Sequence, residues 1–116
     1  MTTPRDTSQD QAASHIGVRT PADVEAARRD DAAERRSPQF RAGASAAYEW
    51  ATGHAERAPV TAAGAAGVPG LPLLTAEVDA VVVQLEDRTV SPGTRDYLSG
   101  VHDALAWICG YSDQPA

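Results

Sequence analysis

The sequence predicts an all-α protein made of two antiparallel helical hairpins. Three observations support this fold class. Apolar residues recur at spacings of three and four, Thr-Pro or Ser-Pro steps precede three of the apolar segments, and one aromatic pattern occurs twice. The hairpins are predicted at residues 20–57 and 75–111. A disordered tail at residues 1–19, a Pro, Gly and Ala linker at residues 58–74 and a C-terminal tail at residues 112–116 complete the chain.

The aromatic pattern recurs with its small residues in register. Its aromatic first residues are 57 apart (97 − 40 = 57). The shared positions are Phe40, Gly43, Ala47 and Trp50 in the first copy, and Tyr97, Gly100, Ala104 and Trp107 in the second. A period of this size is typical of repeated supersecondary units that cannot bury their apolar faces alone. Coincidence in an alanine-rich chain is the alternative interpretation.

The N-terminal third is predicted to hold a tail and one weak helix. Residues 1–19 carry little apolar material beyond Ile16 and Val18, too little to offset the entropy of ordering. Thr20 and the proline after it form a helix start, with Thr20 as the cap. The helix should reach about Arg36, and its stability should depend on docking because its apolar face is narrow.

The first aromatic helix is predicted from Pro38 to Gly53, with Ser37 as its cap and Gly53 as its stop. A Pro, Gly and Ala segment follows. Four glycines and prolines crowd its end between Gly67 and Pro72, so no helix is expected to cross it. This segment is interpreted as a flexible connector between the two copies.

The third helix is predicted to start at Thr75, with an apolar stripe that includes Val78, Val81, Val82 and Leu85. The run of β-branched residues at 81–83 could instead indicate a strand. A helix is favoured because Glu77, Asp79, Gln84 and Glu86 fit a polar helical face. The last helix is predicted from Pro92 to Cys109 and ends at Gly110, and its short connection to the third predicts a hairpin.

The repeated residues suggest a close helix crossing. Small side chains permit close backbone approach, and a glycine inside a helix costs about 1 kcal/mol, so two in equivalent places indicate a packing reason. We expect the aromatic helices to cross at Gly43/Ala47 and Gly100/Ala104, related by a local two-fold. Each tryptophan would cover the other helix. The alternative is that the tryptophans anchor a partner, because aromatics are enriched at interface hot spots.

No catalytic, cofactor-binding or metal-binding residue is predicted. His102 and Cys109 are seven residues apart on the last helix, about 10 Å along its axis, which is beyond hydrogen-bond reach. A solvent-facing histidine and a half-buried cysteine explain them. His15, His54 and His102 are scattered and the chain has one cysteine, so the sequence lacks the closely spaced ligands that a metal site needs. The chain has no lysine, which excludes a Walker-type phosphate loop.

The charge distribution makes nucleic acid an unlikely partner. The net charge is −6, and residues 37–116 hold four arginines against nine acids, a balance of 4 − 9 = −5. An acidic surface repels phosphate, because duplex binding depends on Lys and Arg replacing counterions. The alternative is a regulator whose first helix contacts phosphate through Arg28, Arg29, Arg35 and Arg36.

Composition also predicts where the protein is located and whether it associates. A single cysteine excludes an intrachain disulfide, and no apolar run approaches the roughly 20 residues that span a bilayer. The first residues lack the apolar core of a signal peptide, so the cytoplasm is the expected location. A chain this small has a marginal core, so association with itself as a homodimer or with an unknown protein partner is expected.

The last helix carries a resemblance to a known group. From Ser91 to Gly110 it reads aromatic-x-x-Gly-x-x-x-Ala-Leu-x-Trp-x-x-Gly, which resembles small uncharacterised helical proteins of actinobacteria and their phages and integrative plasmids. The first copy matches more loosely, with Tyr48 in place of the usual leucine. The absence of lysine and asparagine fits GC-rich coding. The resemblance implies an accessory, non-enzymatic role on a mobile element.

The expected function is therefore a small acidic, non-catalytic, protein-binding accessory protein of a phage, a mobile element or a high-GC bacterium. The alternatives are a nucleic-acid-associated regulator, an acidic mimic of DNA that inhibits a host enzyme, and an enzyme using His102 and Cys109.

Overall fold

The computed structural model describes residues 15–29, 36–64 and 67–116. Within these residues it contains helices and isolated β-bridges but no β-strand, which confirms the all-α prediction. The four helices are α2 (Pro21–Arg28), α3 (Pro38–Ala51), α4 (Leu71–Leu85) and α5 (Pro92–Ile108). The predicted tail at 1–14 and the predicted continuation of the first helix over 30–35 lie outside the described residues.

Three helices begin at the predicted caps. The side-chain hydroxyls of Thr20, Ser37 and Ser91 each accept a hydrogen bond from the backbone N–H three residues on, and a proline follows each cap. The missing N–H of a proline costs nothing there, because the first N–H groups of a helix have no intrahelical partner. Local sequence therefore fixes where α2, α3 and α5 begin.

α4 begins four residues earlier than predicted, at Leu71 rather than Thr75. Contrary to the prediction from sequence, Pro72 does not break the helix, because it stands in the first turn, where a proline fits. Gly70 occupies the cap position and supplies no side-chain cap. The earlier start brings Leu74 into the helix, where it is fully buried. The strand alternative for residues 81–83 is wrong, because they are helical.

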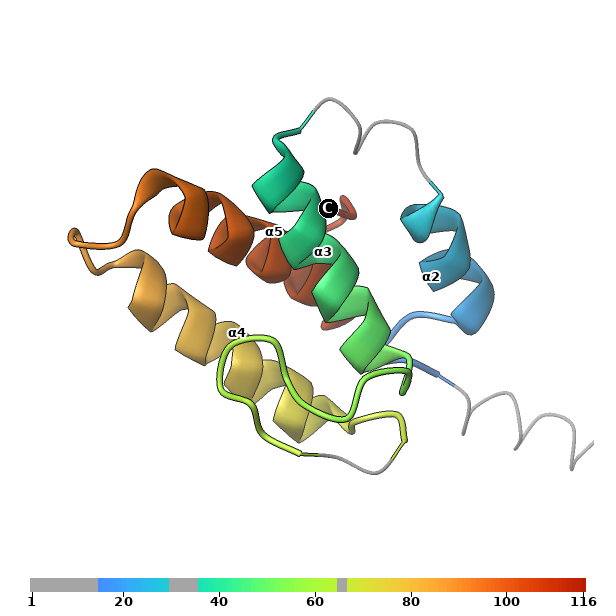
Figure 1. Ribbon diagram of the computed structural model, residues 1–116. Coiled ribbons are helices and arrows are strands. Elements are labelled where there is room, and N and C mark those ends of the chain that lie inside the picture. Colours follow the sequence, from blue (N-terminus) through green and yellow to red (C-terminus); the bar gives the residue numbers. More distant parts are fainter. Residues whose placement is uncertain (1–14, 30–35, 65–66) are drawn as a thin grey trace, which may run out of the picture.

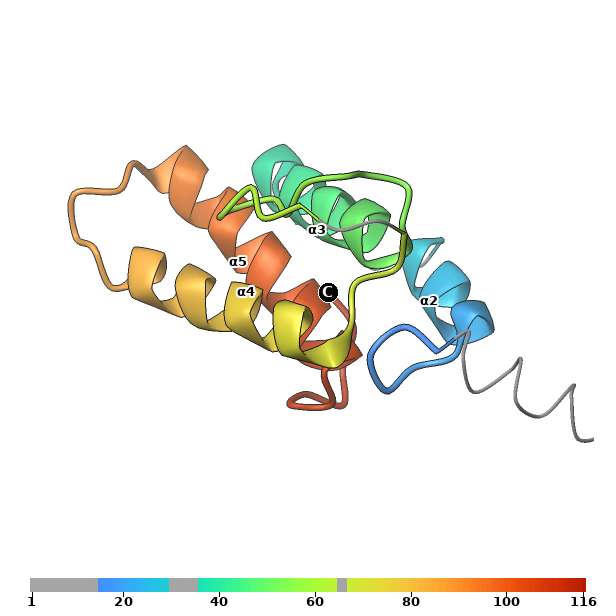
Figure 2. The ribbon, with the colours of Figure 1, turned by 90° about the horizontal axis from the view of Figure 1, so that it is seen from below.

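The helices are arranged around the contact between α3 and α5 (Figures 1 and 2). These two helices run in broadly the same direction, and α4 runs antiparallel to α5 along its side, as the predicted second hairpin requires. α2 touches α3 only slightly. The first predicted hairpin is not confirmed as a packing unit, because among the described residues the main partner of α3 is α5 and not its neighbour in sequence.

The segment before α2 belongs to the fold. Ile16 is only 4% exposed, and the Val18 N–H donates to the carbonyl oxygen of Ile108 at 2.9 Å, at the end of α5. Arg19 donates to the carbonyl oxygens of Trp107 and Ser112 at 2.7 and 2.8 Å. The prediction of a tail up to residue 19 is therefore wrong for residues 15–19, because the carbonyl end of α5 offers them acceptors.

The chain after α5 also contacts the core. The backbone N–H of Ala116 donates to the Tyr48 hydroxyl at 3.3 Å. Residues 112–116, predicted to be a tail, therefore include one contact with α3. Among the described residues, every helix is too short or too polar to cross a bilayer.

Candidate functional site

The α3–α5 crossing contains the two glycines of the repeated pattern. A Cβ added at Gly43 would overlap the carbonyl oxygen of Tyr97, and a Cβ added at Gly100 would overlap the carbonyl oxygen of Phe40. Phe40 stands three residues before Gly43, and Tyr97 three before Gly100, so the two contacts are reciprocal. Each copy therefore supplies the glycine of one contact and the carbonyl oxygen of the other, as a local two-fold axis requires.

The remaining repeated residues surround this crossing and face inward. Ala47 and Ala104 are fully buried and Phe40 is almost so, whereas Tyr97 is partly buried. The carbon of the Arg36 guanidinium lies 4.3 Å from the centre of the Phe40 ring. The apolar face formed by the repeated residues is thus largely buried by contacts within the chain.

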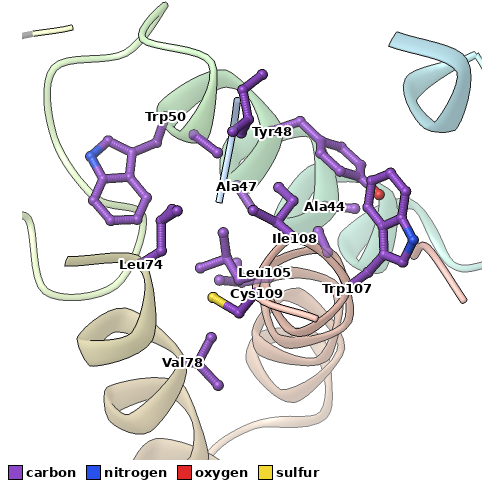
Figure 3. Close-up of a cluster of buried hydrophobic side chains, with 14 of the residues drawn as sticks. Ala44, Ala47, Tyr48, Trp50, Leu74, Val78, Leu105, Trp107, Ile108 and Cys109 are labelled. Atoms are coloured by element: carbon purple, nitrogen blue, oxygen red, sulfur yellow. The ribbon is translucent and has the colours of Figure 1, made fainter. Parts of the chain in front are cut away.

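The two tryptophans are buried, but they pack differently (Figure 3). Trp107 of α5 meets Tyr48 of α3 edge-on, with ring centres 6.5 Å apart, and Arg19 covers the ring at 4.8 Å. Trp107 therefore contacts the other aromatic helix, as expected. Trp50 points instead toward Leu74 of α4, so the expectation is wrong for that residue. With exposed fractions of 1% and 7%, neither indole is available as a surface anchor.

Trp50 leaves one polar atom without a partner. Its indole nitrogen is buried and makes no hydrogen bond to any described residue. A buried donor without an acceptor costs about 1–3 kcal/mol.

The candidate catalytic residues do not form a nucleophile and base pair. Nδ1 of His102 lies 3.1 Å from the carboxylate of its neighbour Asp103, and both side chains are partly exposed. Burial raises the pKa of the Cys109 thiol, the charge of Asp79 adds to the effect, and a hydrogen bond from Thr75 opposes it. Cys109 is therefore held as a thiol, whereas a catalytic cysteine needs a lowered pKa.

The arginines of the alternative phosphate-binding helix are close to carboxylates or rings. Arg28 and Arg29 lie 3.6 and 3.8 Å from the carboxylate of Glu25, and Arg36 lies 3.8 Å from that of Asp103. Arg35 is outside the described residues. No group of three potential metal ligands occurs in the described ranges.

Comparisons with protein-family models, curated proteins and solved structures find no match to this chain.

A buried carboxylate holds the connector between α3 and α4. Glu77 is 1% exposed. One of its oxygens accepts from the N–H groups of Val60 and Thr61 at 2.6 and 3.1 Å, and the other accepts from the Thr61 hydroxyl at 2.6 Å. The connector, which was predicted to be flexible, is thereby tied to α4. Burial, helped by the charge of Glu77, raises the pKa of Tyr97.

The outward side of α4 carries the exposed apolar surface that sequence reasoning missed. We call it the α4 outer face, and its large apolar members are Leu73 and Val83. Leu71 and Val82 are also exposed, but Val82 lies on the opposite flank of α4 from Leu73, because nine residues make about two and a half helical turns. Val83 alone is 66% exposed. The stripe actually buried by α4 is Leu74, Glu77, Val78 and Val81. Val78 and Val81 are buried and Leu85 packs against the core, as predicted, but two residues differ: Val82, predicted in the stripe, is exposed, and Glu77, predicted on the polar face, is buried.

Proposed function

We propose that this protein is a small, acidic, non-catalytic protein-binding module that uses the α4 outer face as its docking surface. The 66% exposure of Val83, a large apolar side chain on the side of α4 away from its buried stripe, carries the proposal. Contiguous exposed apolar residues edged by polar ones are typical of protein-interaction sites. The other apolar surface, formed by the repeated glycines and tryptophans, is buried within the chain.

The charge on and around α4 indicates which class of protein could bind there. Asp79 is the exposed acid of Leu71–Leu85, which has no basic residue, and Glu86 and Asp87 follow it on the surface before Arg88. Residues 37–116 carry a balance of 4 − 9 = −5. Complementary charge steers association and suppresses wrong partners. A protein segment with apolar side chains and flanking basic residues fits this surface. We place the protein as an accessory factor of a high-GC bacterium or its mobile elements, on the resemblance of the last helix.

Capture from host lysate with matched variants tests the proposal. Val83→Glu puts a charge on the α4 outer face, and Ser45→Glu adds the same charge to an exposed position of α3. We expect proteins retained by the wild type and by Ser45→Glu to be lost with Val83→Glu. Direct binding of one purified protein to all three should then show at least a tenfold weakening for Val83→Glu alone. Equal binding to all three would show that the face has no such role.

A further inference from the structure

Residues 16–19 form a tight turn that is closed by its own hydrogen bonds. The Ile16 N–H donates to the carbonyl oxygen of Arg19 at 2.8 Å, and the Arg19 N–H donates back to the carbonyl oxygen of Ile16 at 3.0 Å. Gly17 has a left-handed φ of +60°, the conformation that a type II′ turn requires at its first central residue. The turn is therefore pre-organised, which lowers the entropy cost of docking it on another surface.

The turn fits closely against the C-terminal end of α5. A Cβ added at Gly17 would overlap the carbonyl oxygen of Ile108, and the Val18 N–H donates to the same oxygen at 2.9 Å. The last carbonyl groups of a helix have no partner within the helix. The end of α5 therefore offers these acceptors whether or not the turn is docked.

Arg19 makes the most specific contacts of the turn. Its guanidinium donates to the carbonyl oxygens of Trp107 and Ser112 at 2.7 and 2.8 Å, and its central carbon lies 4.8 Å from the centre of the Trp107 ring. Charge-assisted hydrogen bonds and a cation–π contact thus act on one side chain. Arginine and tryptophan are enriched at the hot spots of protein interfaces, where such contacts hold a ligand.

The helix that follows the turn adds few anchors. We call residues 15–29 the arm. Its helix, α2, buries only Val24 and Ala27 and touches α3 slightly. Figure 1 shows α2 standing to one side of the other helices. Segments with few buried apolar contacts open at a lower free energy than the core, so the arm is the part of the described chain best suited to open by itself.

We propose that the arm detaches from the folded core, and that the end of α5 beneath it binds a protein segment of the same chemistry. That segment is a glycine-containing turn that ends in arginine. The arm acts as an intramolecular competitor, which must open before the segment of another protein docks. Residues 37–116 carry a balance of 4 − 9 = −5, which attracts an arginine-bearing segment. The inference is independent of the α4 outer face.

Competition with a labelled synthetic peptide of residues 15–29 tests the proposal on the full chain. Arg19→Ala weakens the protein's own arm, so the peptide should bind this variant at least about tenfold more tightly than it binds the wild type. Arg29→Ala is the matched control, because the Arg29 side chain belongs to the same arm and is 80% exposed. It should bind the peptide as weakly as the wild type does.

A second peptide separates a specific fit from general attraction to an acidic protein. The Gly17→Ala peptide has the same charge, but its added Cβ would overlap the carbonyl oxygen of Ile108, so it should bind none of the three proteins. Thermal unfolding shows that each protein variant is folded. Equal binding of the first peptide by folded Arg19→Ala and by the wild type overturns the proposal, as does equal binding of the two peptides.

Hydrogen exchange in the wild type tests the opening without any variant. The protection factor of the Val18 amide should be at least about tenfold lower than that of the Leu105 amide inside α5, because the arm opens while α5 stays packed. If the two amides have the same protection factor, the arm leaves only when the whole protein unfolds, and the proposal is overturned.

Discussion

Two glycines set how closely the central helices approach. At Gly43 and Gly100 the neighbouring atom is a backbone carbonyl of the other helix, which cannot move away as a flexible side chain can. Each glycine weakens its own helix by about 1 kcal/mol relative to alanine. The close contact between backbones compensates for this cost, because buried groups such as Ala47 and Ala104 can then pack without voids.

Alanine at either position should destabilise the protein. Gly43→Ala and Gly100→Ala should each lower the free energy of unfolding by about 1–3 kcal/mol, since the added Cβ forces the helices apart. Chemical denaturation measures this change. Gly93→Ala is the matched control in α5, because its Cβ would meet only Gln39 at an ordinary 3.7 Å. It should be neutral or stabilising, and equal losses at all three positions would contradict a specific crossing.

At the scale of elements, the connector between α3 and α4 owes its order to one carboxylate. Glu77 accepts three hydrogen bonds from Val60 and Thr61, and it does so from inside the molecule. A buried charge is costly unless its acceptor capacity is used. The connector and α4 are thus mutually dependent: the loop solvates the carboxylate, and the carboxylate orders the loop.

Removing the carboxylate should loosen the connector without unfolding the helices. Glu77→Ala should cost about 1–3 kcal/mol and should remove hydrogen-exchange protection from the Val60 and Thr61 amides. Amides of α5 should stay protected. Asp79→Ala, on the exposed side of the same helix, should change neither quantity. Persistent protection of the two amides in Glu77→Ala would show that other contacts order the loop.

The limits of sequence reasoning are visible in these same elements. The starts of α2, α3 and α5 were predictable because Ser-Pro and Thr-Pro steps act locally. The glycine positions were predictable because an internal glycine weakens a helix and so signals a packing contact. The burial of Glu77 in α4 was not predictable, because a loop distant in sequence covers this carboxylate. Residues 15–19 were missed because their partners lie at the far end of the chain.

For the whole molecule, one buried and one partly buried group link stability to alkaline pH. Burial is the main cause that raises the pKa values of Tyr97 and Cys109 above their ordinary 10.0 and 9.0. A group whose pKa is raised on folding contributes stability that is fully present below its unfolded pKa. That stability is lost as the pH rises through the folded pKa. Both groups therefore lower the stability of the folded protein as the pH rises.

The melting temperature should fall as the pH rises above about 9. Tyr97→Phe and Cys109→Ala should each make that fall less steep, because the variant no longer loses a proton on unfolding. Calorimetry across this range measures the slope. Tyr111→Phe is the control, because Tyr111 is exposed. A slope that is the same in all four proteins would assign the alkaline effect to other groups.

The reciprocal crossing also has a consequence for how the chain folds. Gly43 and Gly100 are 57 residues apart (100 − 43 = 57), whereas α4 and α5 are joined by a short turn. Closing a long loop costs more entropy than closing a short one, and contacts distant in sequence slow folding. We therefore expect the α4–α5 hairpin to form first and to act as the template on which α3 docks in the rate-limiting step.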